Sequence, residues 1–264
     1  MRLRLSQDAR PQAMTLLIAT AISVVLSFIP YAAFLTYPFR IFVTFIHEGG
    51  HALAALVTGN SVASLMVETN GGGLTQSITS GGLFSQIFIS SAGYLGAMAF
   101  GALLLILIRK TVAARIVLLG SGLYIFALTM IFGLIKPLFS LTGLSGIPFT
   151  LLAGLIISVG LVLLAKFASA KVATFFVSFL AVQCVLNALF DLKILFSVTS
   201  PFADRAVHTD ALNMAQATGI PAIFWTVLWI AFALGILWFA MRLYVARRES
   251  SYQPDLPFEE TPTV

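Results

Sequence analysis

The composition of this 264-residue chain excludes a soluble globular protein. Hydrophobic residues make up 59% of the sequence and charged residues only 9%, whereas soluble domains carry about 25% charged residues. The mean hydropathy is +1.00. So few charged side chains cannot cover a surface in water, and lipid must therefore be the main solvent of the fold. The net charge of +5 comes from cations spread between apolar runs, which is typical of membrane orientation signals and does not indicate nucleic-acid binding.

Long uncharged stretches predict six to seven transmembrane helices. A spanning helix needs about 20 apolar residues, and seven stretches come close to this length. The stretches are residues 14–36, 41–58, 86–108, 116–135, 147–165, 172–195 and 221–243. The predicted fold class is an all-α polytopic membrane protein. We expect residues 1–246 to form one integral membrane domain and the proline-containing residues 247–264 to form a disordered tail.

Cations at the ends of these stretches leave the orientation of the first helices open. The loop at 109–115, the loop at 166–171 and the C-terminal arginines all favour the cytoplasmic side. The arginines of the N-terminus favour that side too. These assignments conflict if the first three stretches all cross the membrane. Either the N-terminus lies outside, or one early stretch does not cross completely.

Residues 62–79 are too polar for a span and predict a short β-hairpin. Two strand-like runs flank Asn70-Gly71, a dipeptide that favours the positive φ angles of a tight hairpin turn. An ordinary polar loop is the alternative interpretation.

Residues 197–220 form a second polar segment between apolar runs. Within this segment, Thr209 can cap the start of a short helix, and Gly219 with Pro221 can end it. The segment therefore predicts a loop that contains one short helix.

The strongest chemical signal is the sequence His47-Glu48-Gly49-Gly50-His51 in an apolar helix. Histidines four residues apart lie on one face of a helix and can bind one Zn²⁺, while Glu48 can act as the base for a zinc-bound water. Ionisable side chains in a spanning helix cost roughly 2.5–3.5 kcal/mol each, yet two of the three histidines stand here. The two glycines lower helix propensity by about 1 kcal/mol each, so close packing or room for a substrate must favour them.

A catalytic zinc site needs a third protein ligand, and Asp191 is the predicted one. The single Cys184 excludes an intramolecular disulfide and a cysteine-based metal cluster. Asp191 is the acidic residue inside a later apolar stretch, and it continues a polar stripe with Gln183 and Asn187 at four-residue intervals. We expect Asn187 to support the site or to orient the substrate. The alternative is a stripe of interhelical hydrogen bonds, with Asp191 paired to a nearby cation.

Three residues of the polar segment are further candidates for the third ligand. They are Asp204, His208 and Asp210. A solvated role or a helix-capping role is the alternative for each, and Asp210 suits the first turn of the short helix.

The chain resembles the site-2 protease family of intramembrane zinc metalloproteases, especially its compact bacterial members. The metal-binding motif in a membrane helix and the hairpin that follows it both carry this resemblance. Two further segments are similar to family motifs: Ser91-Ala92-Gly93-Tyr94-Leu95-Gly96, with tyrosine where the family has proline, and Asn187 with Asp191. The family's ligand aspartate is followed by glycine, whereas Leu192 follows Asp191 here.

The resemblance implies an intramembrane zinc metalloendopeptidase that cleaves peptide bonds in transmembrane segments of membrane protein substrates. Glu48 would activate the zinc-bound water that acts as nucleophile, and the zinc ligands would be His47, His51 and Asp191. The implied location is the lipid bilayer of the bacterial inner membrane. Because a peptide bond within a helix is shielded, the substrate must unwind, and the hairpin edge could hold it by strand addition.

Other functions compete with this interpretation. A membrane transporter could use the His/Asp cluster as an ion transit site, and a non-catalytic relative could serve as a scaffold. Membrane peptidases of the prenyl-protein or heat-shock type take a glutamate as third ligand, and no apolar stretch after Glu48 contains one. Three histidines are too few for the ligand sets of a membrane di-iron oxygenase.

Overall fold

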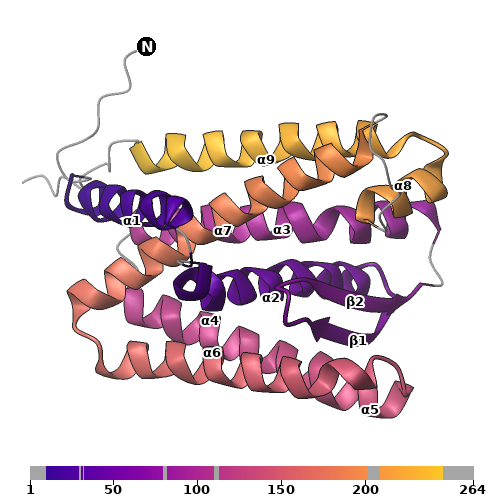
Figure 1. Ribbon diagram of the computed structural model, residues 1–264, viewed down its shortest axis with the longest axis horizontal. Coiled ribbons are helices and arrows are strands. Elements are labelled where there is room, and N and C mark those ends of the chain that lie inside the picture. The colour runs from indigo at the N-terminus through magenta and orange to yellow at the C-terminus, as the bar shows by residue number, and fades with distance from the viewer. Residues whose placement is uncertain are drawn as a thin grey trace, which may run out of the picture.

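The computed structural model describes residues 10–29, 31, 33–79, 82–109, 113–200 and 209–245. The tail at 247–264 lies outside these residues, so its predicted disorder stays a prediction. Within the described chain, helices form almost the whole fold and one antiparallel pair of strands accompanies them (Figure 1). The helices are α1 (Arg10–Phe28), α2 (Ala33–Val57), α3 (Leu83–Arg109), α4 (Ala114–Met130), α5 (Lys136–Ser140), α6 (Ile147–Phe167), α7 (Ala170–Thr199), α8 (Asp210–Thr218) and α9 (Ala222–Val245), and the strands are β1 (Ser61–Val67) and β2 (Gly73–Ile78). This arrangement confirms the predicted all-α membrane fold with its short hairpin.

Five helical segments of the described chain are long and apolar enough to cross a membrane. They are Leu83–Ile108, Ala114–Ser140, Leu144–Phe167, Ala170–Thr199 and Ala222–Tyr244. The second of these is continuous because α4 passes through a π-helical turn, Ile131–Ile135, into α5.

The first two predicted spans differ from the structure. The apolar part of α1 is a shorter helix, Ala13–Leu26, and α2 is not among the five segments. The predicted first span, residues 14–36, extends too far, because α1 already ends at Phe28, and α2 begins at Ala33 and contains Pro38. A proline so close to a helix start removes one intrahelical hydrogen bond, and the rest of the helix continues.

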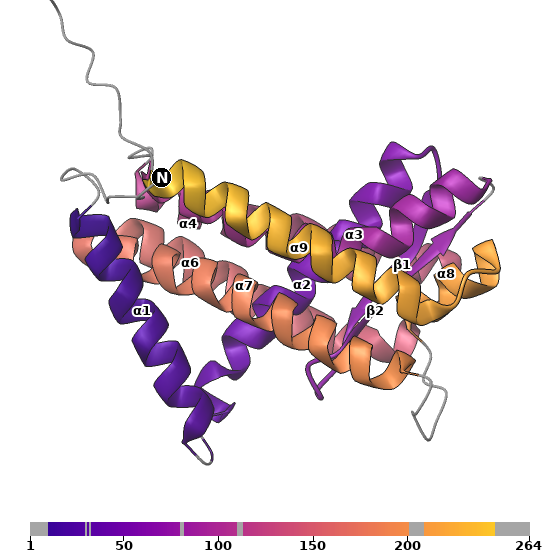
Figure 2. The ribbon, with the colours of Figure 1, turned by 90° about the horizontal axis from the view of Figure 1, so that it is seen from above.

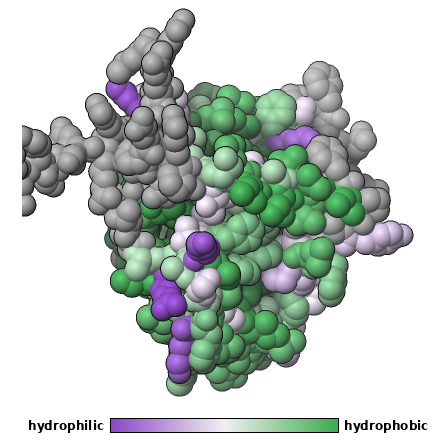
Figure 3. Space-filling view, turned by 90° about the vertical axis from the view of Figure 1, so that its left-hand side faces the viewer, coloured by the Kyte–Doolittle hydropathy of each residue, from purple (hydrophilic) through white to green (hydrophobic). Residues whose placement is uncertain are grey.

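The described helices bring three cation-bearing ends to the same end of the molecule. Five spans in alternating directions place the ends of α3, α6 and α9 together, and Arg115 at the start of α4 donates a 2.7 Å hydrogen bond to Ala168 O after α6. Figure 2 shows α1 starting toward this end and α2 finishing beside the hairpin at the opposite end. Together, α1 and α2 therefore run once from one end of the molecule to the other. Figure 3 views the cation-bearing end, where a few hydrophilic residues stand among hydrophobic ones.

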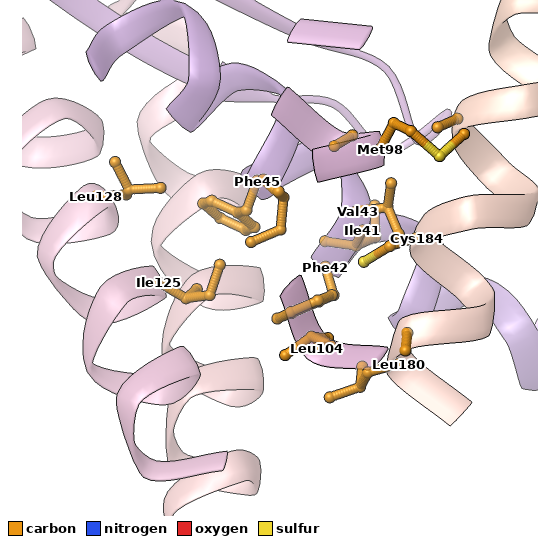
Figure 4. Close-up of a cluster of buried hydrophobic side chains, with 14 of the residues drawn as sticks. Ile41, Phe42, Val43, Phe45, Met98, Leu104, Ile125, Leu128, Leu180 and Cys184 are labelled. Carbon is orange, nitrogen blue, oxygen red and sulfur yellow. The ribbon is translucent and has the colours of Figure 1, made fainter. Parts of the chain in front are cut away.

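Helix α2 forms the centre of the hydrophobic core and packs against α3, α4 and α7 (Figure 4). Its glycines allow this close contact. A Cβ at Gly49 would lie 2.5 Å from the Tyr124 hydroxyl, and a Cβ at Gly50 would overlap Ala92 O. Of the two explanations for these glycines, close packing therefore applies. The side chains that meet in this core include Ile41, Phe42, Val43, Phe45, Met98, Leu104, Ile125, Leu128, Leu180 and Cys184.

The hairpin has the predicted strands but a different turn. Asn70 does not take a positive φ, whereas Gly71 does, at 86°. The Gly71 N–H donates to Glu68 O at 3.0 Å, and the Glu68 N–H donates to Gly72 O at 2.9 Å. The connection is thus a three-residue loop with a left-handed glycine at its end, and it needs one positive φ where a two-residue turn needs two. Asn70 contributes through its side chain, which accepts from the Gly72 N–H at 2.6 Å.

The short helix α8 begins and ends where the sequence predicted. The Thr209 hydroxyl accepts a 3.2 Å hydrogen bond from the Leu212 N–H, which caps the first turn. Gly219 ends the helix with a left-handed φ of 72°. Figure 1 shows α8 at the same end of the molecule as the hairpin, so both can reach the C-terminal half of α2.

Candidate metal centre

The two histidines of α2 face each other across one helical turn. Their Nε2 atoms lie 3.1 Å apart, and their rings are nearly perpendicular, with 4.9 Å between centroids. The other ring nitrogen of His51, Nδ1, donates a 2.7 Å hydrogen bond to Ile89 O. With the proton on Nδ1, the lone pair of His51 Nε2 points toward His47. Two ring nitrogens in such contact repel each other unless a proton or a cation lies between them.

Asp210 completes the group from α8. One of its carboxylate oxygens, Oδ2, lies 3.7 Å from His47 Nε2 and 3.4 Å from His51 Nε2. Asp210 is the first residue of α8, where the Thr209 cap and the free backbone N–H groups favour a negative charge. Within the described chain, these three ligand atoms lie within 4.8 Å of one another.

The donor set fits a divalent metal ion. Zinc bonds of 2.0–2.2 Å in a tetrahedron hold ligand atoms about 3.3 Å apart, close to the 3.1, 3.4 and 3.7 Å between these atoms. The hydrogen bond from His51 Nδ1 to a backbone carbonyl is typical of metal-binding histidines. Burial raises the pKa of the Asp210 carboxyl, but the neighbouring His51 and His47 rings lower it further, to well below its usual range. Asp210 is therefore ionised, which is the form that binds a metal.

Glu48 is buried beside the histidines and contacts strand β2 of the hairpin. Its side chain is 5% exposed, and the Thr75 hydroxyl of β2 donates a 3.0 Å hydrogen bond to its backbone carbonyl. Gly73, at the start of β2, packs against the Glu48 side chain, since a Cβ at Gly73 would lie 2.7 Å from Glu48 Oε1. The glycine at the start of β2 thus lets the strand pack directly on the Glu48 carboxylate.

A cavity of about 710 Å³ opens onto this group. Strand β2 lines one side, and α7 and α8 line others. Among the residues that the structure describes, β2 pairs with β1 alone, so the second edge of β2 has no strand partner there. The lining residues include Arg40, His47, Glu48, His51, Leu74, Thr75, Tyr94, Asp191, Ile194, Asp210 and Asn213.

Asp191 also lines the cavity, but it does not belong to the group of three ligand atoms. It makes no ion pair or hydrogen bond to another described residue, and the neighbouring Lys193 lies over the Phe190 ring instead. His47 and Arg40 are both near enough to act on Asp191 electrostatically. Asp191 is thus a carboxylate of the cavity wall.

Asn187 lies in the polar stripe and is not among the residues that line the cavity. Its amide donates to Gln183 O at 2.8 Å and to Gln183 Oε1 at 3.1 Å. Gln183 in turn donates to the Ser23 hydroxyl at 3.2 Å, so the stripe connects α7 to α1. Asp204 and His208 lie outside the described residues.

Sequence reasoning assigned no role in the site to two residues that contact it. A Cβ at Gly93 of α3 would overlap Nε2 of both His47 and His51. The next residue, Tyr94, places its ring perpendicular to His47 with 4.7 Å between centroids. The segment Ser91–Gly96 was compared only with a family motif, and its small residues alone do not show that the contact falls on the histidines.

Comparison with known proteins gives one match that covers most of the chain. A model of the Peptidase M50B-like family matches residues 15–240, a range that includes His47, Glu48, His51 and Asp210. Neither the curated proteins nor the solved structures contain a match. The family match confirms the resemblance to site-2 proteases that the sequence motifs carried. The chain is a membrane peptidase that belongs to the Peptidase M50B-like family.

Proposed function

We propose that this chain is an intramembrane zinc metalloendopeptidase that hydrolyses peptide bonds in the transmembrane segments of membrane proteins. The observation that carries the proposal is the group of His47, His51 and Asp210 ligand atoms within 4.8 Å, beside the buried carboxylate of Glu48. A zinc hydrolase needs this combination of three ligands and one base that is not a ligand.

In this proposal, Nε2 of His47, Nε2 of His51 and a carboxylate oxygen of Asp210 hold the metal. Bound zinc supplies an acidified water and polarises the substrate carbonyl. Asp210 takes the place that the sequence assigned to Asp191. Two observations support this change: Asp210 Oδ2 is 3.4 Å from His51 Nε2, and Asp191 is outside the group of ligand atoms.

Glu48 carries the proton during hydrolysis. It accepts one proton from the attacking water as the water oxygen bonds to the peptide carbonyl carbon. When the C–N bond breaks, Glu48 returns this proton to the leaving amine. Burial at 5% exposure keeps bulk water from competing for the proton, and the contacts of Gly73 and Thr75 hold the residue in place.

The free edge of β2 would hold the unwound substrate. Facing residues of an antiparallel pair alternate between hydrogen-bonded and non-hydrogen-bonded positions, and the Glu68 N–H donates to Gly72 O. Two residues further along, Met66 and Leu74 therefore form a hydrogen-bonded pair, and the Leu74 N–H points toward β1. The N–H groups of Gly73 and Thr75 point away from β1, toward the outer edge of the sheet. An extended segment added to this edge lies along the cavity and next to Glu48. Apolar cavity residues such as Ile194 suit the side chains of a transmembrane segment.

The five apolar helices make this chain an integral membrane protein, and we place it in the bacterial inner membrane by its resemblance to compact bacterial site-2 proteases. The end that carries Arg115 and Lys166 would face the cytoplasm.

The test is to compare purified wild-type chain with Glu48→Gln, in zinc content and in cleavage of a transmembrane peptide. We expect about one zinc per chain in both proteins and loss of cleavage in the variant alone, because the amide cannot accept the proton. Cleavage by the Glu48→Gln variant would refute the role of Glu48. A wild-type protein that moves ions across vesicles but cuts no peptide would establish the transporter instead.

A further inference from the structure

Tyr94 borders the metal centre and has no part in the mechanism described so far. It lines the cavity, and it directly follows Gly93, whose backbone packs against both histidines. The perpendicular contact with the His47 ring, 4.7 Å between centroids, places the Tyr94 ring beside a residue that carries one of the three ligand atoms.

The Tyr94 ring is held by a second aromatic contact. It stacks on Trp229 of α9 with 5.5 Å between centroids and 28° between ring planes. Trp229 is 1% exposed, and its indole N–H donates a 2.9 Å hydrogen bond to the hydroxyl of Ser91, one turn before Tyr94 on α3. The phenol is thus positioned before any substrate binds, as an electrostatic catalyst requires.

Among the described residues, none forms a hydrogen bond with the hydroxyl of Tyr94. With respect to these residues, the hydroxyl can act on a substrate. Glu48, Asp191 and Asp210 are all near enough to act on it electrostatically, and they line the same cavity as Tyr94. A hydroxyl in this cavity can donate one hydrogen bond to a group that enters it.

We propose that Tyr94 is a catalytic residue that donates a hydrogen bond to the oxyanion of the tetrahedral intermediate. This inference rests on the proposed peptidase function. When the water oxygen bonds to the carbonyl carbon, the π electrons of C=O move to the carbonyl oxygen. The Tyr94 O–H stabilises that negative charge and keeps its own proton. As the C–N bond breaks, the C=O bond forms again and the amine leaves with the proton from Glu48.

Other donors of the cavity are less well placed. Arg40 lies about two turns, or roughly 10 Å, before His47 on the helix axis, and the Thr75 hydroxyl already donates to Glu48 O. Asn213 is the main competitor, because it follows Asp210 by one turn on α8 and lines the cavity. It lacks the aromatic contacts that fix Tyr94, so its amide is less well preorganised.

The experiment uses full-length zinc-loaded chain in detergent and compares wild type with Tyr94→Phe, Asn213→Leu and Tyr124→Phe. Phenylalanine keeps the ring contacts of Tyr94 and removes only its hydroxyl. Tyr124 is the matched control, since it packs on the opposite side of α2 against Gly49 and Phe100. The readouts are kcat, KM, zinc per chain, and the affinity for a phosphinic peptide, which mimics the tetrahedral intermediate.

We expect Tyr94→Phe to lower kcat by about 10²–10³-fold, the effect of removing one oxyanion donor. Affinity for the phosphinic peptide should fall with kcat, while KM, zinc content and the binding of uncleaved substrate in a Glu48→Gln background stay unchanged. Asn213→Leu and Tyr124→Phe should keep wild-type affinity for the phosphinic peptide.

Three results would overturn the inference. Tyr94→Phe could retain wild-type kcat, or it could lose zinc and substrate affinity as a packing residue would. Asn213→Leu could instead show the loss of kcat and of phosphinic peptide affinity, which would make Asn213 the donor. Failure of the peptidase proposal differs from all of these, because then wild type itself cleaves nothing.

Discussion

Gly93 of α3 packs its backbone against Nε2 of His47 on α2, so closely that any side chain at position 93 would overlap this nitrogen. The contact explains how both helices can border the candidate metal centre. Helix α3 contributes no metal ligand of its own, but it approaches near enough to accept the hydrogen bond from His51 at Ile89 O and to place Tyr94 beside His47.

Gly93→Ala should therefore weaken the metal site without unfolding the chain. The methyl group occupies the space of both Nε2 atoms, so we expect zinc affinity to fall by about 10–100-fold or more, as for other disturbed ligand geometries. Zinc competition with a chelator measures this. Gly96→Ala, one turn further on α3, is the control, because its Cβ would meet only Gly50 Cα at an ordinary 3.6 Å. Equal zinc affinity in both variants would show that the close approach of α3 at Gly93 does not affect zinc binding.

Comparison of Asp210→Asn with Asp191→Asn should show which carboxylate is a metal ligand and which one only lines the cavity. The 3.4 Å between Asp210 Oδ2 and His51 Nε2 leads us to expect zinc occupancy well below one per chain for Asp210→Asn. Asp191→Asn should keep about one zinc per chain, and its effect should be on substrate binding. Metal analysis after gel filtration gives the answer. The opposite pattern would return the ligand role to Asp191.

Substitutions at Thr75 test the free edge of β2. Thr75→Pro removes an N–H that the register turns outward, so the hairpin should survive while the substrate loses a backbone hydrogen bond. Thr75→Val keeps that N–H and removes the hydroxyl that holds Glu48 O. We expect cleavage to be abolished by Thr75→Pro, with zinc retained, and only reduced by Thr75→Val. Proline at Leu74 is a poor test, since the inward N–H of Leu74 belongs to the hairpin itself. If Thr75→Pro cleaved as well as Thr75→Val, strand addition at this edge would be excluded.

Removal of zinc should destabilise the fold. A metal bound between α2 and α8 stabilises the native state by RT ln(1 + [Zn]/Kd), or about 4 kcal/mol at a thousandfold excess over Kd. A chelator should therefore lower the Tm of the wild-type chain, as followed by scanning fluorimetry in detergent. The chelator should have little effect on Asp210→Asn, which has lost the link from α8. A Tm that does not respond to chelation in wild type would contradict the site.

Local signals in the sequence predicted the elements around the site well. Thr209 and Gly219 correctly predicted the two ends of α8, because helix capping and a left-handed glycine both act within one helical turn. The hairpin was also predicted, but its turn was not, since Asn70 uses its side chain where a two-residue turn would need a positive φ. The first span was predicted over residues 14–36, but α1 ends at Phe28 and α2 continues through Pro38, because one missing hydrogen bond near a helix start does not end the helix.

Scarcity of charge indicated, from the sequence alone, that the chain lies in a membrane, and it singled out His47, Glu48 and His51 as the candidate site. Their spacing fixes their relative positions, because one helix turn brings i and i+4 together. The sequence could not identify which acidic residue from outside α2 lies beside the histidines, because the fold could bring either Asp191 or Asp210 to them. The packing of α8 against α3 and α9 places Asp210 at the ligand atoms and leaves Asp191 on the cavity wall. Contacts between residues distant in sequence are set by the shape of the whole core, and only the tertiary structure decided them.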